Sequence, residues 1–113
     1  MDDRTAHGFR EKLEAMRAAL AAEEAATESD RAPVELDQQS VGRLSRMDAM
    51  QVQAMALGQS RRRAAQMKRI DAALARIEGG DFGWCLDCGE EIGLRRLQLD
   101  PAAPYCVHCA GTR

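Results

Sequence analysis

Apolar residues recur at helical spacing over the first part of the chain. Phe9, Leu13, Met16 and Leu20 follow one another at steps of four, three and four residues. This heptad spacing predicts a helix over about residues 5–28, with an apolar stripe wide enough for one partner helix. Glu and Arg fill the other faces, which we expect to be solvated.

A second, longer helix is predicted over about residues 41–78. It carries two apolar heptad stripes, formed by Met67, Ile70, Leu74 and Ile77 and by Met47, Met50, Ala54 and Leu57. Because these stripes do not share a phase, we expect a slip of the seam between Gly58 and Arg63. The pair Gly79-Gly80 ends this helix.

Residues 29–40 interrupt the helical pattern with turn formers and Pro33. Asp37 or Ser40 is suited to cap the second helix, and Ser45 begins a capping-box pattern; the sequence leaves these starts open. The two stretches predict an antiparallel coiled-coil hairpin over residues 1–78, with its tip at about 29–48. At 1.5 Å per residue the second helix would extend for roughly 57 Å, which suggests a projection that is inserted into a partner.

Composition limits which partners the protein can bind and in which cellular compartment we expect it. The 113 residues fit one small domain, and the net charge of -2 argues against a protein that neutralises DNA phosphates along its length. No run approaches the roughly 20 apolar residues of a membrane span. The start, from Met1 to Arg4, is charged and unlike a secretory signal. We therefore expect a cytoplasmic protein whose thiols stay reduced.

The last third contains the clearest chemical signal. Cys85 and Cys88 form one Cys-x-x-Cys pair, and Cys106 and Cys109 form another after seventeen intervening residues. Paired knuckles at this spacing are typical of a four-thiolate zinc site, whereas a redox dithiol would not explain two pairs. Four thiolates fill the tetrahedral shell, so the single zinc ion is expected to be structural.

The neighbours of the cysteines have secondary roles in this interpretation. His108 lies between two cysteines and is interpreted as a bystander, because four thiolates already suffice. Six residues are expected to pack around the metal and onto the helix ends: Phe82, Trp84, Ile92, Leu94, Leu97 and Tyr105. The predicted fold is therefore mainly α, a long antiparallel coiled-coil hairpin followed by a small four-cysteine zinc finger over residues 79–113.

The finger resembles that of the DksA/TraR family. The resemblance lies in the run from Asp81 to Gly89, the run from Glu91 to Leu97, Pro101 and the second cysteine pair. It is dense over residues 79–110. Over residues 5–78 it rests on architecture, two long helices that lead directly into the finger.

The resemblance implies a transcription regulator that binds bacterial RNA polymerase. In this family the coiled coil enters the secondary channel of the enzyme, and acidic residues at its tip act near the catalytic magnesium and modulate initiation. Some members work with the alarmone guanosine tetraphosphate. These proteins do not grip promoter DNA, which agrees with the lack of a basic excess in this chain.

The family tip motif, Asp-x-x-Asp-x-Ala, is absent from this chain. The nearest tip candidates are Asp48, Ala49, Asp37 and Glu35. Ser45 stands where an earlier acid of the motif would lie, so Asp48 would act with one carboxylate in place of two. The alternative is that Asp48 is only a first-turn acid favoured by the helix dipole.

Basic residues supply a second set of candidates. Counted back from the first cysteine, the basic helix positions of the family fall on Arg62 and Arg69, which share one face, and Arg95 and Arg96 follow in the finger. Arg62, Arg69, Arg95 and Arg96 are the candidate contacts for the alarmone or for polymerase. Ala110 replaces the lysine that follows the last cysteine in the family. The basic stretch from Arg61 to Arg76 is also expected to pair in part with glutamates of the first helix.

The residues are also compatible with two other functions. A zinc-containing nucleic-acid-binding protein would use Arg61–Arg63 and the finger, and its affinity would fall steeply with salt. A coiled-coil adaptor would pair its seams with another protein or with itself. We expect no enzymatic activity, because the residues contain no nucleophile–base pair and the metal shell is closed. A closed hairpin favours a monomer.

Overall fold

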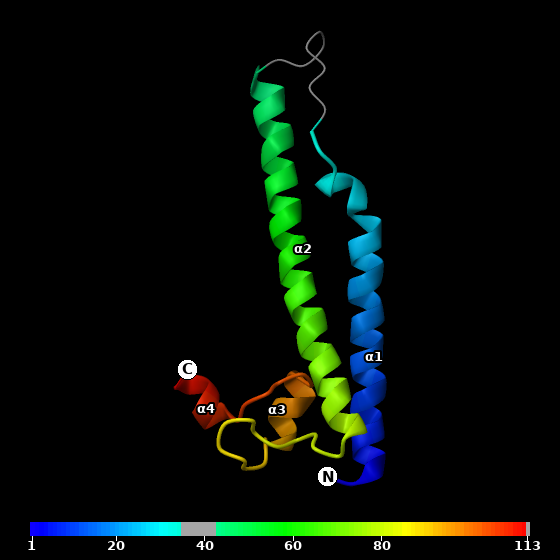
Figure 1. The fold of residues 1–113 in the computed structure, drawn as a ribbon, viewed down its shortest axis with the longest axis vertical. Coiled ribbons are helices and arrows are strands. Elements are labelled where there is room, and N and C mark those ends of the chain that lie inside the picture. Colours follow the sequence, from blue (N-terminus) through cyan, green and yellow to red (C-terminus); the bar gives the residue numbers. More distant parts are fainter. Residues whose placement is uncertain (35–42, 113) are drawn as a thin grey trace. The chain divides into compact units, whose positions relative to one another are not determined.

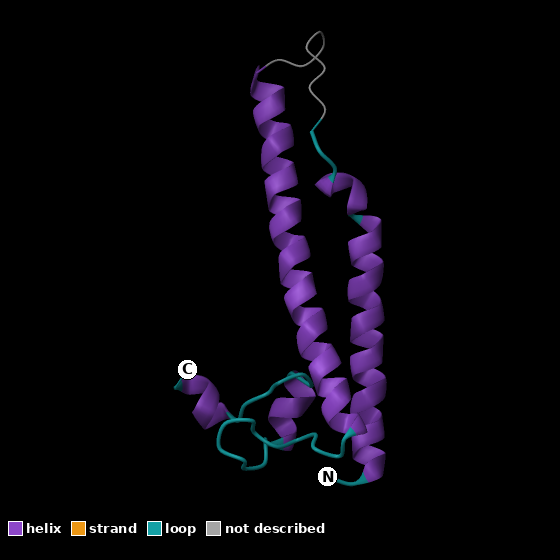
Figure 2. Cartoon of the chain, in the orientation of Figure 1, coloured by secondary structure: helices purple, strands orange, loops and turns teal. Residues whose placement is uncertain are grey.

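The computed structural model describes residues 1–34 and 43–112, which are mostly helical, with loops at the N-terminus, around the 3-10 helix and in the finger (Figure 2). Its elements in chain order are α1 (Asp3–Ala26), the 3-10 helix η1 (Glu28–Arg31), α2 (Arg43–Glu78), α3 (Leu94–Leu99) and α4 (Val107–Gly111). No strand occurs among the described residues, where a single isolated bridge joins Trp84 to Glu91. The predicted mainly α fold is confirmed, and no described helix has the length and apolar content to cross a membrane.

The ends of the two long helices follow from local sequence. The Thr5 N–H donates to Oδ1 of Asp2 at 2.7 Å, which satisfies one of the unpaired amides at the start of α1. At the end of α2 the Asp81 N–H donates to the Arg76 carbonyl at 2.8 Å, and Gly80 has a φ of 79°. A left-handed glycine with this bond closes a Schellman motif, so the glycine pair ends α2 as predicted.

The second helix begins at Arg43. Ser45 therefore lies inside its first turn, and the capping-box start at Ser45 was wrong. The other two candidate caps, Asp37 and Ser40, lie outside the described residues. The first helix runs from Asp3 to Ala26, two residues earlier at each end than expected.

The chain forms two compact units, each containing a part of both long helices (Figure 1). One, which we call the base unit, comprises Met1–Ala18 and Gln66–Arg113; the other, the distal unit, comprises Ala19–Ala65. In each unit the segments of α1 and α2 run in opposite directions.

The apolar core lies in the base unit. Leu13 and Ala73 are fully buried, and Ile70 and Phe9 are nearly so. The Phe9 ring lies 5.4 Å from that of Phe82, at a tilt of 48°, which is a favourable aromatic geometry. These contacts link α1, α2 and the start of the finger, and they confirm the first predicted stripe.

Polar contacts surround this core. Arg17 Nε donates to Asp71 Oδ1 at 2.6 Å, and Arg10 lies 3.3 Å from Glu78. Lys12 Nζ donates to the Gln98 carbonyl at 2.7 Å and so ties α1 to α3. All of these groups are solvated, so each contact contributes little to stability and mainly fixes the register.

The seam of α2 keeps one heptad phase. Ala56, Arg63 and Ile70 are buried at intervals of seven, and Ile77 is half-buried at the next interval. The expected slip between Gly58 and Arg63 is therefore wrong. The predicted stripe of Met47, Met50, Ala54 and Leu57 is exposed, because a seam of small and polar residues takes its place.

Polar side chains build the seam of the distal unit. Glu24 accepts hydrogen bonds from Ser60 Oγ at 2.6 Å and from Arg63 Nε at 3.0 Å. Thr27 Oγ1 accepts from Arg63 at 3.1 Å and from Arg31 at 2.9 Å. Arg63 therefore bonds two α1-side partners while only 8% of its side chain is exposed. The expected pairing of this basic stretch with glutamates of the first helix is confirmed at Arg63.

Candidate metal centre

The first cysteine pair lies in a tight loop between α2 and α3. The Cys85 N–H donates to the Glu90 carbonyl at 2.8 Å, and the Gly89 N–H donates back to the Cys85 carbonyl at 3.0 Å. Gly89 has a φ of 75°, a conformation that other residues rarely adopt. The loop therefore turns both thiols to one side. The glycine directly after Cys88 is a sequence signal for this turn that the cysteine spacing alone does not contain.

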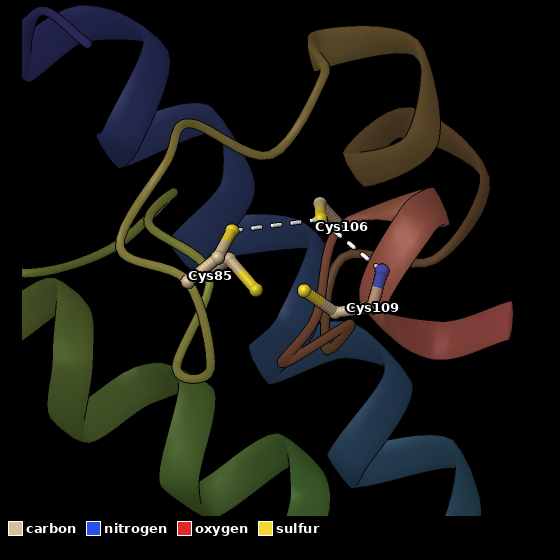
Figure 3. A group of neighbouring side chains, drawn as sticks. Cys85, Cys106 and Cys109 are labelled. Atoms are coloured by element: carbon tan, nitrogen blue, oxygen red, sulfur yellow. Dashed lines mark hydrogen bonds between the residues drawn. The ribbon is translucent and has the colours of Figure 1, made fainter. Parts of the chain in front are cut away.

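The second pair lies at the start of α4. Cys106 is the N-cap residue, and its Sγ accepts the Cys109 N–H at 3.4 Å. One further bond, from the Leu86 N–H to the Pro104 carbonyl at 3.0 Å, joins the two halves of the finger. Figure 3 shows Cys85 in its loop facing Cys106 and Cys109.

The four sulfur atoms gather at one point. The ligand atoms of Cys85, Cys88, Cys106 and Cys109 all lie within 4.8 Å of one another. Cys88 Sγ and Cys106 Sγ are 3.8 Å apart. A tetrahedral zinc ion with Zn–S bonds of about 2.3 Å requires sulfur separations of about 3.8 Å. The arrangement therefore fits one zinc ion with a closed shell, as predicted from the spacing.

The surroundings favour ionisation at one cysteine and oppose it at another. Burial acts to raise the pKa of Cys85, but N–H groups of Cys88, Cys106 and Asp87 stabilise its thiolate and lower that pKa to about 6. Hydrogen bonding to Cys106 and then burial raise the pKa of Cys109. Since zinc binds thiolates, its binding must displace protons from this group and becomes tighter as pH rises.

The apolar neighbours divide into two groups. Phe82, Ile92 and Leu97 are buried, as expected, and Tyr105 is half-buried. Trp84 and Leu94 are 45% and 50% exposed, so their expected burial was wrong. The antiparallel bridge from Trp84 to Glu91 fixes alternate residues of this loop on opposite sides. His108 is exposed and does not belong to the cysteine group.

The tip candidates fall partly within the described chain. Asp48 and Ala49 lie in the second turn of α2, and both are exposed. Glu35 and Asp37 lie outside the described residues. A role for any of the four stays a prediction.

The basic candidates differ in their local contacts. Arg62 is exposed on α2 in the distal unit, and Arg95 is exposed on α3. Arg69 donates to Asp100 Oδ2 at 2.8 Å, and half-buried Arg96 donates to the Tyr105 carbonyl at 2.8 Å. Arg69 and Arg96 are thus already engaged in hydrogen bonds within the base unit, and a ligand would have to compete with these bonds.

Comparison with known proteins agrees with this geometry. Residues 80–113 match the model of the prokaryotic dksA/traR C4-type zinc finger. The RNA polymerase-binding transcription factor DksA of Haemophilus influenzae is 51% identical over 43 residues, and that of Escherichia coli K12 is 46% identical over 43 residues. These matches span 38% of this chain and only 30% and 28% of the two relatives.

Two solved structures resemble nearly the whole chain. Transcription factor DksA2 from Pseudomonas aeruginosa has a TM-score of 0.80 and 28% identity, over 99% of this chain and 84% of that one. The DnaK suppressor protein from Agrobacterium tumefaciens C58 has a TM-score of 0.56 and 25% identity, over 95% of this chain and 92% of that one. Residues 80–113 therefore form a finger of the dksA/traR type, and nearly the whole chain is similar in fold to transcription factor DksA2.

Proposed function

We propose that this chain is a transcription regulator that binds bacterial RNA polymerase through its secondary channel and modulates initiation. One observation carries the proposal: a finger about half identical to that of RNA polymerase-binding transcription factors lies in a fold that matches DksA2 over 99% of this chain. The hairpin, residues 1–78, would enter the channel, and the finger, residues 79–113, would remain at its base.

The protein needs few components besides polymerase for this function. It acts as a cytoplasmic monomer, catalyses no reaction of its own, and requires neither specific DNA nor a membrane. The net charge of -2 supports this view, because nonspecific DNA binding draws on many unpaired cations. Arg63, Arg69 and Arg17 are each held by a carboxylate, which lowers the number of cations available to phosphates.

Asp48 is the residue that we propose to act near the polymerase active centre, with Ala49 beside it. Its carboxylate is exposed in the second turn of α2. A solvated carboxylate is available to reach a metal ion or a nucleotide path in a partner. Glu35 and Asp37 are further acids that we assign to the same end of the hairpin.

Arg62, Arg69, Arg95 and Arg96 are proposed to contact polymerase, with guanosine tetraphosphate as a second ligand for the same cations. Arginine suits both roles because its planar fork binds carboxylates and phosphates in pairs. Arg62 and Arg95 are exposed, so we expect them to contribute first. Arg69 would have to leave Asp100 before it contacts a phosphate.

The test combines binding with a measurement on promoter complexes. We expect the zinc-loaded chain to bind core RNA polymerase and to change the lifetime of open complexes. Asp48→Asn should abolish most of the change in lifetime and leave polymerase affinity within about twofold, because an exposed carboxylate contributes little to binding. Asp3→Asn, which removes another exposed carboxylate, is the control and should behave as wild type.

Absence of binding to polymerase would refute the proposal. An unchanged effect of Asp48→Asn on open-complex lifetime would remove Asp48 from the mechanism while leaving the polymerase assignment in place.

A further inference from the structure

The outer face of α2 in the distal unit carries an apolar stripe that no described residue covers. Met47, Met50, Met55 and Leu57 are between 38% and 62% exposed. Met47 precedes buried Ala56 by nine residues, which is two and a half helical turns, so the two side chains point to opposite sides of α2. This outer face, defined by Met47, Met50, Ala54, Met55, Leu57 and Gly58, is therefore turned away from α1.

The spacing of the outer face suits a second helix. Met47, Met50, Ala54 and Leu57 follow heptad steps of three, four and three, which is the pattern of a coiled-coil seam. At Gly58 an added Cβ would meet only Nη1 of the flexible Arg62 side chain, at 3.7 Å. Small residues at Ala54 and Gly58 would thus let another backbone approach closely. Exposed apolar residues gathered on one face mark interaction sites, whereas scattered single ones do not.

The charges beside the outer face identify the partner. Asp48 lies seven residues before Met55, and Arg62 lies seven residues after it. If a second α2 packs antiparallel with a two-fold axis beside Met55, Asp48 of each copy lies opposite Arg62 of the other. Helical rotation places Asp48, Met55 and Arg62 on the same flank of the outer face. A two-fold axis brings this flank of one copy beside the same flank of the other copy.

The same axis also brings apolar residues of the two copies together. Met55 would face Met55 of the second copy, and Met50 would lie within one turn of Leu57 of the second copy. Among the described residues, no salt bridge occupies Asp48 or Arg62, so both are available for this pairing. The outer face therefore carries its own complement in polarity and charge.

We propose that a second copy of this chain docks on the outer face, forming an antiparallel α2–α2 dimer about an axis beside Met55. The contact from Met47 to Arg62 is roughly 22 Å long. Stable interfaces bury about 1,200 to 2,000 Å², and a contact of this length falls at or below that range. The association is therefore weak, with a dissociation constant on the order of 10 to 100 μM, and monomer prevails at lower concentrations.

The dimer proposal does not rest on the proposed polymerase function, although both assign roles to Asp48 and Arg62, and it is tested on the zinc-loaded chain alone. Sedimentation velocity over a concentration series should give a monomer that converts to a dimer. Met55→Glu places two like charges at the axis and should weaken dimerisation at least tenfold. Ala25→Glu, a matched exposed substitution on α1, should leave the dissociation constant within twofold. Circular dichroism checks that each variant keeps its helices.

A charge reversal tests the antiparallel register. Asp48→Arg and Arg62→Asp should each weaken the dimer about three- to tenfold, because each removes two pairs related by the axis. The double variant exchanges the partners and should restore the wild-type dissociation constant.

Three results would overturn the proposal. One is a chain that stays monomeric up to roughly ten times the upper dissociation constant expected from the contact length. Another is a dimer that Met55→Glu does not weaken, or that Ala25→Glu weakens equally. The last is a double charge reversal that fails to recover the affinity lost in the single variants.

Discussion

Arg63 offers the sharpest test of how the distal unit is held together. Its side chain is 8% exposed and bonds Glu24 and Thr27 at distances of 2.9 to 3.1 Å. Arg63→Ala removes these donors and leaves a gap in the seam. Removing one partner of a fully buried ion pair costs about 3 to 5 kcal/mol. Because 35% of the Glu24 side chain is in contact with water, we expect a smaller loss, about 2 kcal/mol.

The measurement is urea unfolding followed by far-UV circular dichroism, with zinc and pH held fixed. Arg63→Lys keeps the charge but not the planar fork, so it should lose about half as much stability. Arg61→Ala, at an exposed neighbouring position, is the control and should change the free energy of unfolding by no more than about 0.5 kcal/mol. Equal losses for Arg61→Ala and Arg63→Ala would refute the reasoning that Arg63 holds the seam.

The remaining predictions concern the metal, pH and backbone. Chelation of zinc should unfold the finger and shift the fluorescence of Trp84, since metal binding energy is part of its folding energy; unchanged emission would contradict this. Hydrogen bonding from Ser60, followed by Arg63, lowers the pKa of Glu24 from 4.5, so the stability it provides is present above that pH and is lost as pH falls through the lowered pKa. As pH falls through this acidic range, the free energy of unfolding should therefore decrease more steeply for wild type than for Glu24→Gln. Gly83 has a φ of 96° and its added Cβ would lie 3.1 Å from Met1, so Gly83→Ala should cost about 1 to 2 kcal/mol; Gly93→Ala, in open space, should be nearly neutral in the same denaturation assay.

Local sequence determined the parts that were predicted well. Cys85, Cys88, Cys106 and Cys109 were assigned from spacing alone, because a Cys-x-x-Cys turn brings its own two ligands together before any tertiary contact forms. The first stripe was also predicted, since Phe9 and Leu13 recur at a helical period and are buried.

The predicted stripe of Met67, Ile70, Leu74 and Ile77 is buried or half-buried, but the distal part of the α2 seam could not be predicted from hydrophobicity. Met47 and Met50 are more apolar than Arg63, yet Arg63 is buried and the methionines are exposed. The reason lies in the other segment: Glu24 of α1 and Thr27, directly after α1, present acceptors to the seam, and these satisfy a buried guanidinium. Which residues of α2 are buried is decided by their partners on the other segment, and the apolar pattern of α2 alone does not contain this information.

Polymerase binding is the central claim, and competition for core RNA polymerase tests it most directly. A labelled secondary-channel factor is bound to the core enzyme, and the zinc-loaded chain is titrated against it. Displacement at micromolar concentrations is the predicted result, with Met55→Glu included so that self-association does not limit the free monomer. Simultaneous binding of both proteins would contradict entry into the secondary channel, and absence of binding would contradict the polymerase assignment as a whole.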